Sequence, residues 1–165
     1  MNQRLIGFAK PRGAVISGDS NYRYLLWRTW DLKGPRLFII SLNPSTADDR
    51  ADDPTLRRCI SLAQASGFGG IILGNLFALR AQNPRVLYTV SDPVGRDNDQ
   101  WLDDMIHQTH KIAVAWGDRG GYLGRSSEVI SRIANPYCFG MNRTGEPKHP
   151  LYLPKNTPLV RYLAR

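Results

Sequence analysis

The sequence predicts an α/β protein, a three-layer α/β/α sandwich around a central, mostly parallel sheet of four strands. Four apolar runs have the length of strands buried on both faces, and they span residues 37–42, 70–74, 112–116 and 136–140. Between these runs lie segments whose apolar residues recur at helical spacing. Strands that alternate with helices favour parallel pairing, right-handed crossovers and helices on both faces of the sheet.

A segment rich in aromatic residues, residues 14–30, precedes the first buried run. Tyr22, Tyr24 and Leu26 alternate along it with Arg23, Leu25 and Trp27, and Arg28 follows. A period of two residues is typical of a β-strand. The segment therefore predicts an N-terminal aromatic-rich hairpin or edge strand beside the four-stranded sheet.

Three helices are expected among the strands. The first begins at Asp53-Pro54, a capping residue followed by proline, and ends at Gly67. The second spans residues 98–110, and the third follows the next strand. Their apolar stripes are Leu56, Cys59, Ile60 and Ala63, then Trp101, Leu102, Met105 and Ile106, then Tyr122, Ser126, Val129, Ile130 and Ile133. From Met141 onward we expect a loop and a short terminal helix.

Length and composition indicate one ordinary globular domain, residues 1–165. The chain has 42% hydrophobic and 22% charged residues. Its apolar runs are far shorter than the roughly 20 residues of a membrane span, and it begins without the apolar segment of a signal peptide. Cys59 and Cys138 are too few for a disulfide framework and lack zinc-site spacing. We expect a cytoplasmic monomer with reduced cysteines and no membrane partner.

The charge distribution favours a polyanionic partner. The net charge is +8, and residues 119–165 hold eight basic and only two acidic side chains. Arginine outnumbers lysine 17 to 5, and the planar guanidinium suits bidentate phosphate contacts. DNA or a nucleotide is therefore a candidate partner. The alternative is that the basic charge serves solubility alone.

Polar residues gather where the four predicted strands end. Residues 43–48, 75–80, 116–118 and 142–149 follow the strands, and ligands of parallel α/β sheets bind beyond the carboxyl ends of their strands. These stretches contain most of the unusual polar residues of the chain. We therefore expect them to line one common cleft.

The first stretch offers an amide and several carboxylates. Asn43 precedes Pro44, and its amide can orient a water or contact a ligand edge, although an asparagine there also commonly caps its own turn. Four acidic residues follow: Asp48, Asp49, Asp52 and Asp53. They suggest a metal site or a general base. However, Asp53 is better explained as a helix cap, and no second ligand cluster exists, so we expect no metal.

The other stretches contribute a second amide and an imidazole. Asn75 can pair with a donor and an acceptor on a planar base, whereas Phe77 fits a core position better than a stacking platform. His149 lies in a proline-rich loop that excludes regular helix, although an isolated loop histidine is more often only a surface residue. His107 and His110 are at metal-compatible spacing, but we assign them to the solvated end of a helix.

The motifs described above, taken together, resemble those of two protein families. The chain resembles the uracil-DNA glycosylase superfamily in four ordered places: Leu42-Asn43-Pro44, residues 71–80, Ala115-Trp116-Gly117, and His149-Pro150-Leu151-Tyr152-Leu153. It is more closely similar, over nearly its whole length, to an uncharacterised family of small bacterial and phage proteins classed as a domain of unknown function. The motifs of that likeness are Asn43-Pro44-Ser45-Thr46-Ala47-Asp48, Asp53-Pro54-Thr55, Asp92-Pro93-Val94-Gly95 and His149-Pro150-Leu151-Tyr152-Leu153-Pro154.

The glycosylase resemblance implies a fold like that of uracil-DNA glycosylase and roles for individual residues. Asn43 matches the residue that places the attacking water, and Asn75 matches the asparagine that recognises the pyrimidine edge. His149 matches the histidine that hydrogen-bonds the base oxygen as negative charge develops on the departing base. Leu153 matches the side chain that fills the gap left in the DNA stack. Asp48 completes the set of catalytic candidates.

The chemistry implied by the resemblance needs neither metal nor cofactor. Cleavage of an N-glycosidic bond leaves negative charge on the base, so fixed donors aimed at the base lower the barrier. The target nucleotide must also leave the stack. The base-binding candidates are Asn75, Phe77, Pro44 and Ser45, and the DNA-contacting candidates are Arg80, Arg143, Lys148, Leu153 and Lys155.

The sequence departs from the glycosylase pattern at two motif positions. Leu151 and Tyr152 stand where the usual His-Pro-Ser-Pro-Leu pattern has serine and proline, and the stretch after Asn43 has no aromatic to stack on a base. We expect a glycosylase-like protein that recognises a flipped-out nucleobase in DNA and hydrolyses its N-glycosidic bond. The alternatives are a non-catalytic nucleic-acid-binding protein of the same fold and a small-nucleotide enzyme that uses residues 48–53, with or without magnesium.

Overall fold

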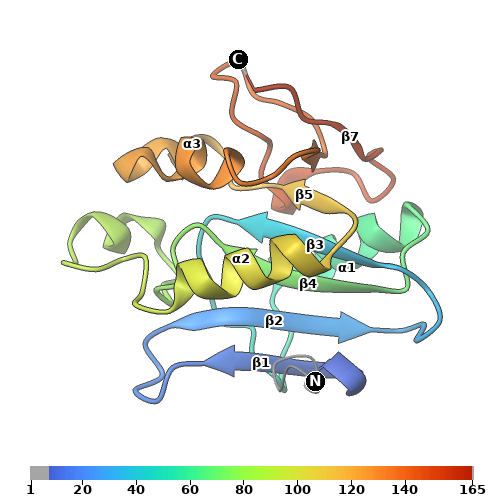
Figure 1. Ribbon diagram of the computed structural model, residues 1–165, viewed down its shortest axis with the longest axis horizontal. Helices are drawn as coiled ribbons and strands as arrows, with labels where there is room; N and C mark the ends of the chain where they lie inside the picture. The colour runs from blue at the N-terminus through green and yellow to red at the C-terminus, as the bar shows by residue number, and fades with distance from the viewer. Residues whose placement is uncertain (1–7, 165) are drawn as a thin grey trace.

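A seven-stranded mixed sheet forms the middle of the molecule (Figure 1). The computed structural model describes residues 8–164 of the chain. The strand order in space is β1-β2-β4-β3-β5-β6-β7. The strands are β1 (Arg12–Ile16), β2 (Arg23–Thr29), β3 (Arg36–Ser41), β4 (Gly70–Asn75), β5 (Ile112–Val114), β6 (Tyr137–Cys138) and β7 (Val160–Arg161).

The predicted α/β class is confirmed, but the sheet is larger and less parallel than predicted. The pairings of β4 with β3, β3 with β5 and β5 with β6 are parallel. The pairings of β1 with β2, β2 with β4 and β6 with β7 are antiparallel. The aromatic-rich segment forms the predicted hairpin, and this hairpin extends the sheet through β4 instead of only covering an edge.

The predicted terminal helix is wrong, because the end of the described chain returns to the sheet as β7. Pro150, Pro154 and Pro158 recur every four residues in this segment. Each proline lacks a backbone N–H and clashes with the preceding helical turn, so a regular helix cannot pass through them. Val160 and Arg161 instead pair with Cys138 and Tyr137 of β6.

The first two helices begin where the sequence predicts them. Asp53 caps α1 by accepting a hydrogen bond from the Leu56 N–H at 2.8 Å, and the helix is followed by Gly67 in the left-handed region at φ +84°. The third predicted helix is shorter than expected, because Leu123 and Gly124 have positive φ and interrupt it. The helices are α1 (Pro54–Ala65), α2 (Asn98–Gln108) and α3 (Arg125–Ile130), with 3₁₀ helices η2 (Pro84–Tyr88), η3 (Asp118–Gly124) and η4 (Pro150–Tyr152).

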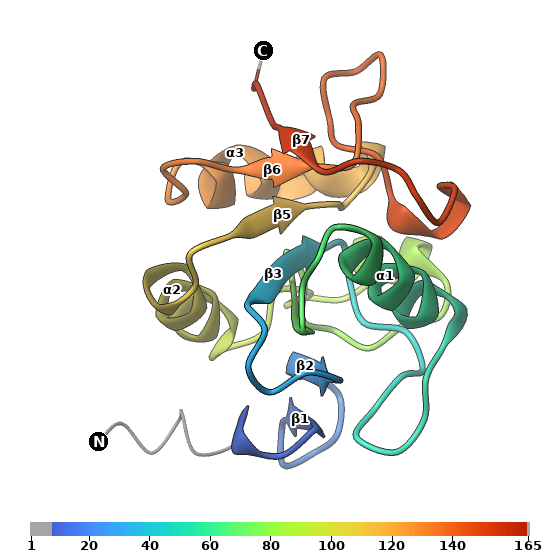
Figure 2. The same ribbon diagram turned by 90° about the vertical axis from the view of Figure 1, so that its right-hand side faces the viewer.

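Successive residues of the central strands point into two different cores. Phe38 and Ile40 of β3 pack in a core that includes Leu102 of α2, whereas Leu37 and Ile39 pack in a core with α1. Figure 2 shows α1 on one side of the sheet and α2 on the other. Because both faces of β3 are covered, its residues from Leu37 to Ile40 are continuously apolar instead of alternating.

A β-bulge in β2 changes the face on which its first residue lies. Val15 is opposite Leu25 and Ile16 is opposite Arg23, so Tyr24 is an extra residue on β2. Simple alternation would place Arg23 on the face of Leu25. Instead the Arg23 guanidinium reaches the carbonyl oxygen of Ala47, 2.7 Å away, on the α1 side of the sheet. Bulges commonly re-aim a side chain next to a functional site.

Cys59 and Cys138 are both buried and free of disulfide bonds. Burial raises the pKa of the Cys59 thiol to about 12. Throughout residues 8–164, no helix has the length and apolar character required to traverse a lipid bilayer.

Candidate functional site

A cavity of about 630 Å³ opens at the carboxyl ends of the central strands. Its wall includes residues from all four stretches that follow the predicted strands, together with the first residues of α1. The volume lies within the usual range for small-molecule sites. Among the predicted site residues, the cavity brings together Asn43, Ser45, Asn75 and His149.

Asn43 is held by its amide nitrogen. Nδ2 donates to the carbonyl oxygens of Pro44 and Ala81, each at 2.9 Å. Both amide hydrogens are therefore used within the protein. The remaining polar atom, Oδ1, is an acceptor and can orient a water or a ligand N–H.

Asn75 and Ser41 lie side by side on β4 and β3, because they are partners in the parallel register. Both line the cavity, with exposed fractions of 1% and 5%. The Asn75 Nδ2 and the Ser41 Oγ have no hydrogen-bond partner in the described part of the chain. Buried polar groups are normally satisfied, so two unsatisfied groups in one cavity wall require an explanation.

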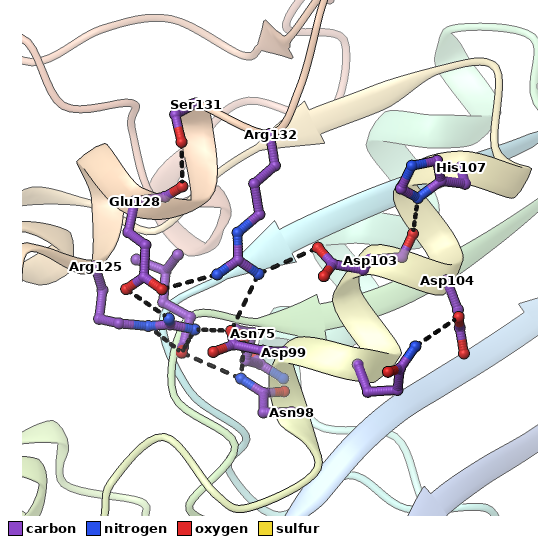
Figure 3. A network of polar contacts seen from close by, with 12 residues as sticks. Asn75, Asn98, Asp99, Asp103, Asp104, His107, Arg125, Glu128, Ser131 and Arg132 are labelled. Carbon is purple, nitrogen blue, oxygen red and sulfur yellow. Dashed lines mark hydrogen bonds and ion pairs between the residues drawn. The ribbon is translucent and has the colours of Figure 1, made fainter.

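Behind Asn75, a polar network fixes the end of β4 (Figure 3). Asn98 at the start of α2 donates from Nδ2 to the carbonyl oxygens of Asn75 and Leu76, at 2.9 and 3.2 Å. Arg125 of α3 donates to the same Leu76 oxygen and pairs with Asp99 at 2.9 Å. The backbone of Asn75 is thus anchored from the α2 side, while its side chain stays available to the cavity on the other face.

Arg23 brings a buried positive charge to the cavity wall. Its exposed fraction is 3%, and within residues 8–164 the only hydrogen bond of its side chain goes from Nη1 to the Ala47 carbonyl oxygen. Nε has no partner there. Burial lowers the pKa of Arg23 to about 10, and the negative charge of Asp53 opposes this shift. The Asp53 carboxylate itself already accepts from the Leu56 and Ala47 N–H groups.

The His149 ring has one defined role for each nitrogen. The Leu151 N–H donates to Nδ1 at 3.2 Å, so Nδ1 is the acceptor and Nε2 carries the proton in the neutral ring. Burial lowers the pKa of His149, and the charge of Asp53 partly offsets this effect. His149 is therefore neutral near pH 7 and offers the cavity an N–H donor.

The loops that carry these groups are bonded to one another. Asp118 accepts hydrogen bonds from Asn142 Nδ2 at 2.9 Å and from Thr144 Oγ1 at 2.6 Å. The Trp116 indole N–H donates to Glu146 Oε2 at 2.6 Å. These bonds join the segment after β5 to the loop before His149 and close one side of the cavity.

A family model matches residues 23–151 of the chain. The chain belongs to the DUF1643 family. The family is described as a protein of unknown function, in agreement with the closer of the two resemblances in the sequence. No match was found among curated proteins or among solved structures. The glycosylase activity and fold implied by the more remote resemblance therefore have no support from these comparisons.

The matched range of this DUF1643 member includes the whole cavity wall except Tyr152. The wall also contains residues that the sequence did not predict, among them Arg23 and Ser41. Ser41 carried a detectable signal, because it is the one hydroxyl of β3 and directly follows four apolar residues. Arg23 carried none, because its placement depends on the bulge at Tyr24.

Several predicted site residues lie off the cavity wall. Phe77 is completely buried in the core on the α2 side, where the centroid of its ring lies 5.7 Å from that of the Tyr122 ring. Pro44 is buried, and its carbonyl oxygen accepts from Asn43. Asp48 accepts from the Arg50 and Ala51 N–H groups of its own turn, which lowers its pKa.

The predicted DNA-contacting residues are dispersed. Arg80 donates to the Ser20 carbonyl oxygen, and Arg143 and Lys148 are exposed on the loop before His149. Leu153 is half-buried against the core on the α1 side. Tyr152, by contrast, lines the cavity with 87% of its surface exposed. Lys155 lines a second, smaller groove next to the cavity.

The acidic residues of the loop before α1 are already engaged. Asp52 pairs with the buried Arg28 at 2.8 Å and with Arg12 at 3.5 Å, and Asp53 caps α1. Across residues 8–164, no three or more His, Cys, Asp or Glu side chains are grouped so that they could hold a metal ion.

Proposed function

We propose that the cavity binds a nucleobase extruded from DNA and that the protein hydrolyses the N-glycosidic bond of that nucleotide. The single observation that carries this proposal is the placement of Asn43, Asn75 and His149. They lie 32 and 74 residues apart along the chain but line one cavity. A planar base offers donors and acceptors at its edge, and such a set of fixed amide and imidazole groups suits that edge.

The chemical roles follow from which atoms remain available. His149 presents an Nε2–H donor that can bond the base oxygen on which negative charge grows. Asn43 presents Oδ1, which can hold a water near the sugar carbon. Asn75 supplies its amide to the base edge. Tyr152 supplies the exposed aromatic surface for stacking that residues 43–48 lack, whereas Trp116, which also lines the cavity, is buried with 1% of its surface exposed.

A base-release assay tests this proposal. Duplex and single-stranded oligonucleotides that carry uracil, mismatched bases or modified bases are incubated with the protein, and abasic sites are detected by alkaline cleavage. His149→Ala removes the proposed leaving-group donor and is expected to slow release by about a hundredfold. Asn43→Ala is expected to slow release as well. His110→Ala, an exposed residue at the end of α2, serves as the matched control.

A second candidate function is nucleic-acid binding without hydrolysis. The observation in its favour is that the cavity carboxylates are occupied: Asp53 accepts two backbone N–H groups and Asp118 accepts two side-chain donors. Asp53 is engaged through both of its carboxylate oxygens and is not free to act as a general base, whereas both donors to Asp118 reach Oδ1. DNA binding that weakens with salt, without release of any tested base, would favour this candidate. The loop of residues 48–53 gives little support to the magnesium-dependent alternative, because its carboxylates are also engaged.

A further inference from the structure

A second groove, with a volume of about 370 Å³, lies directly beside the cavity. One wall is α1, which contributes Pro54, Arg57, Arg58 and Ser61, and the other wall is the segment that contains Leu151 and Lys155. Pro54 and Leu151 also line the cavity. The two hollows therefore adjoin each other at these two residues.

We call this hollow the basic groove, because the positive charges of Arg57, Arg58 and Lys155 line it without acidic partners in the described part of the chain. Within residues 8–164, Arg57, Arg58 and Lys155 form no ion pair. Helix α1 contains no acidic residue, and none occurs between residues 147 and 164. The nearest carboxylates along the chain, Asp52 and Asp53, already have partners of their own.

The groove also has a partly ordered donor set. Arg57 donates from Nη1 to the Asp52 carbonyl oxygen at 3.0 Å, which restrains its guanidinium, and Arg58 is half-buried. Two guanidinium groups and one ammonium around a small concave surface match the oxygens of a phosphate. Like-charged groups held close together repel one another, and a bound dianion or phosphodiester relieves that repulsion.

We propose that the basic groove binds a phosphate group of the nucleotide whose base enters the cavity. The identity of the ligand rests on the proposed base-binding function, whereas the phosphate site itself rests on Arg57, Arg58 and Lys155. The base and its phosphate are then recognised by separate walls that meet at Pro54 and Leu151. The phosphate comes either from a free nucleotide or from the DNA backbone, and the same chemistry serves both sources.

The test measures the binding of a short fluorescein-labelled single-stranded DNA by anisotropy, with competition by nucleosides and by their 5′-monophosphates. In Arg57→Gln/Arg58→Gln, DNA binding is expected to weaken at least tenfold. The slope of log K against log salt is expected to fall by about 0.7 for each lost contact. Lys10→Gln/Lys33→Gln removes the same charge from exposed sites beyond the groove and is expected to bind nearly as the wild type does. Lys155→Gln gives an independent reading if the double arginine variant folds poorly.

The competitors locate the phosphate. The double arginine variant is expected to lose the preference for monophosphates over nucleosides and to keep its nucleoside affinity. If monophosphates compete well, the groove takes a terminal phosphate. If only oligonucleotides compete, it takes a backbone phosphodiester. Equal binding by the double variant and the lysine control would overturn the groove assignment.

The cavity variant separates this proposal from the function on which it rests. His149→Ala changes the cavity and leaves the charged groove residues Arg57, Arg58 and Lys155 in place. If His149→Ala binds DNA and nucleosides as the wild type does while the arginine variant is weakened, base binding in the cavity fails and the phosphate groove stands. If the arginine variant is unchanged while His149→Ala is weakened, the groove fails and base binding stands.

Discussion

At the scale of single residues, one backbone hydrogen bond decides which nitrogen of His149 carries the proton. The Leu151 N–H occupies Nδ1, so protonation of that nitrogen would place two hydrogens against each other. Burial acts in the same direction, because it disfavours the charged ring. Both effects favour the neutral form with the proton on Nε2, which is the donor that the proposed chemistry requires.

A pH titration tests this description of His149. Its pKa is lowered in the folded protein, whereas the unfolded chain has the ordinary value of about 6.5. Between those two values the unfolded chain binds more protons, so folding stability falls as the pH falls from about 6.5 through the folded pKa. Urea unfolding at pH 7 and pH 5 should show this loss in the wild type and less of it in His149→Gln. An NMR midpoint above 6.5 for the His149 ring would contradict it.

At the scale of secondary-structure elements, η3 sets the position of the Trp116 ring in the cavity wall. Gly120 lies so close to the indole that an added Cβ would be 2.1 Å from Cδ1 of Trp116 and 2.6 Å from its Nε1. That nitrogen donates to Glu146, so a displaced ring loses the bond that closes the loop. The bulge at Tyr24 likewise sets the position of a side chain in the cavity wall, because it turns Arg23 toward the cavity.

Gly120→Ala is therefore expected to cost about 1–3 kcal/mol of stability through overpacking and to weaken binding of the DNA probe. Gly121→Ala is the matched control, because a Cβ there meets only Glu146 Oε1, at 3.7 Å, and the residue is exposed. Urea unfolding followed by tryptophan fluorescence measures the first effect, and anisotropy measures the second. Indistinguishable behaviour of the two alanine variants would show that η3 does not constrain the ring.

At the scale of the whole molecule, the sequence predicted the features that neighbouring residues determine. It did not predict those that depend on contacts between distant segments. The buried strands and the starts of α1 and α2 follow from runs of neighbouring residues, such as Leu37 to Leu42, or from a cap such as Asp53. The placement of polar stretches around one cavity follows from parallel pairing. Arg23 was missed because an extra residue in the pairing of two strands leaves no mark in the alternation of side chains.

Other differences arise from packing between distant segments. Tyr152 lies at the cavity wall while Leu153 turns toward the core, and a short loop sequence does not reveal which of two adjacent apolar residues will be buried. The basic groove was not predicted because Arg57 and Arg58 occupy a helix and Lys155 a loop almost a hundred residues later. Only the contact between α1 and the segment around η4 brings them together.

The last strand shows that residues beyond the family match contribute to the stability of the whole sheet. Tyr162 follows β7, is 8% exposed, packs in the core on the α2 side and donates from its hydroxyl to the Gly145 carbonyl oxygen at 2.9 Å. Its backbone N–H donates to the Pro136 carbonyl oxygen at 2.9 Å. The segment after residue 151 thus covers one edge of the sheet and supports the loop that carries His149.

Tyr162→Ala is expected to lower the free energy of unfolding by roughly 3–5 kcal/mol, as truncation of a buried aromatic ring typically does. Leu163→Ala provides the neighbouring control, because Leu163 is 70% exposed and surface truncations usually change stability by less than about 0.5 kcal/mol. Tyr162→Phe keeps the ring and removes only the bond to Gly145, so it should cost about 1 kcal/mol. If β7 is an integral part of the fold, urea denaturation is expected to show the largest loss for Tyr162→Ala, a smaller loss for Tyr162→Phe and the smallest for Leu163→Ala. Equal stability of Tyr162→Ala and Leu163→Ala would instead mean that the sheet is held without its last strand.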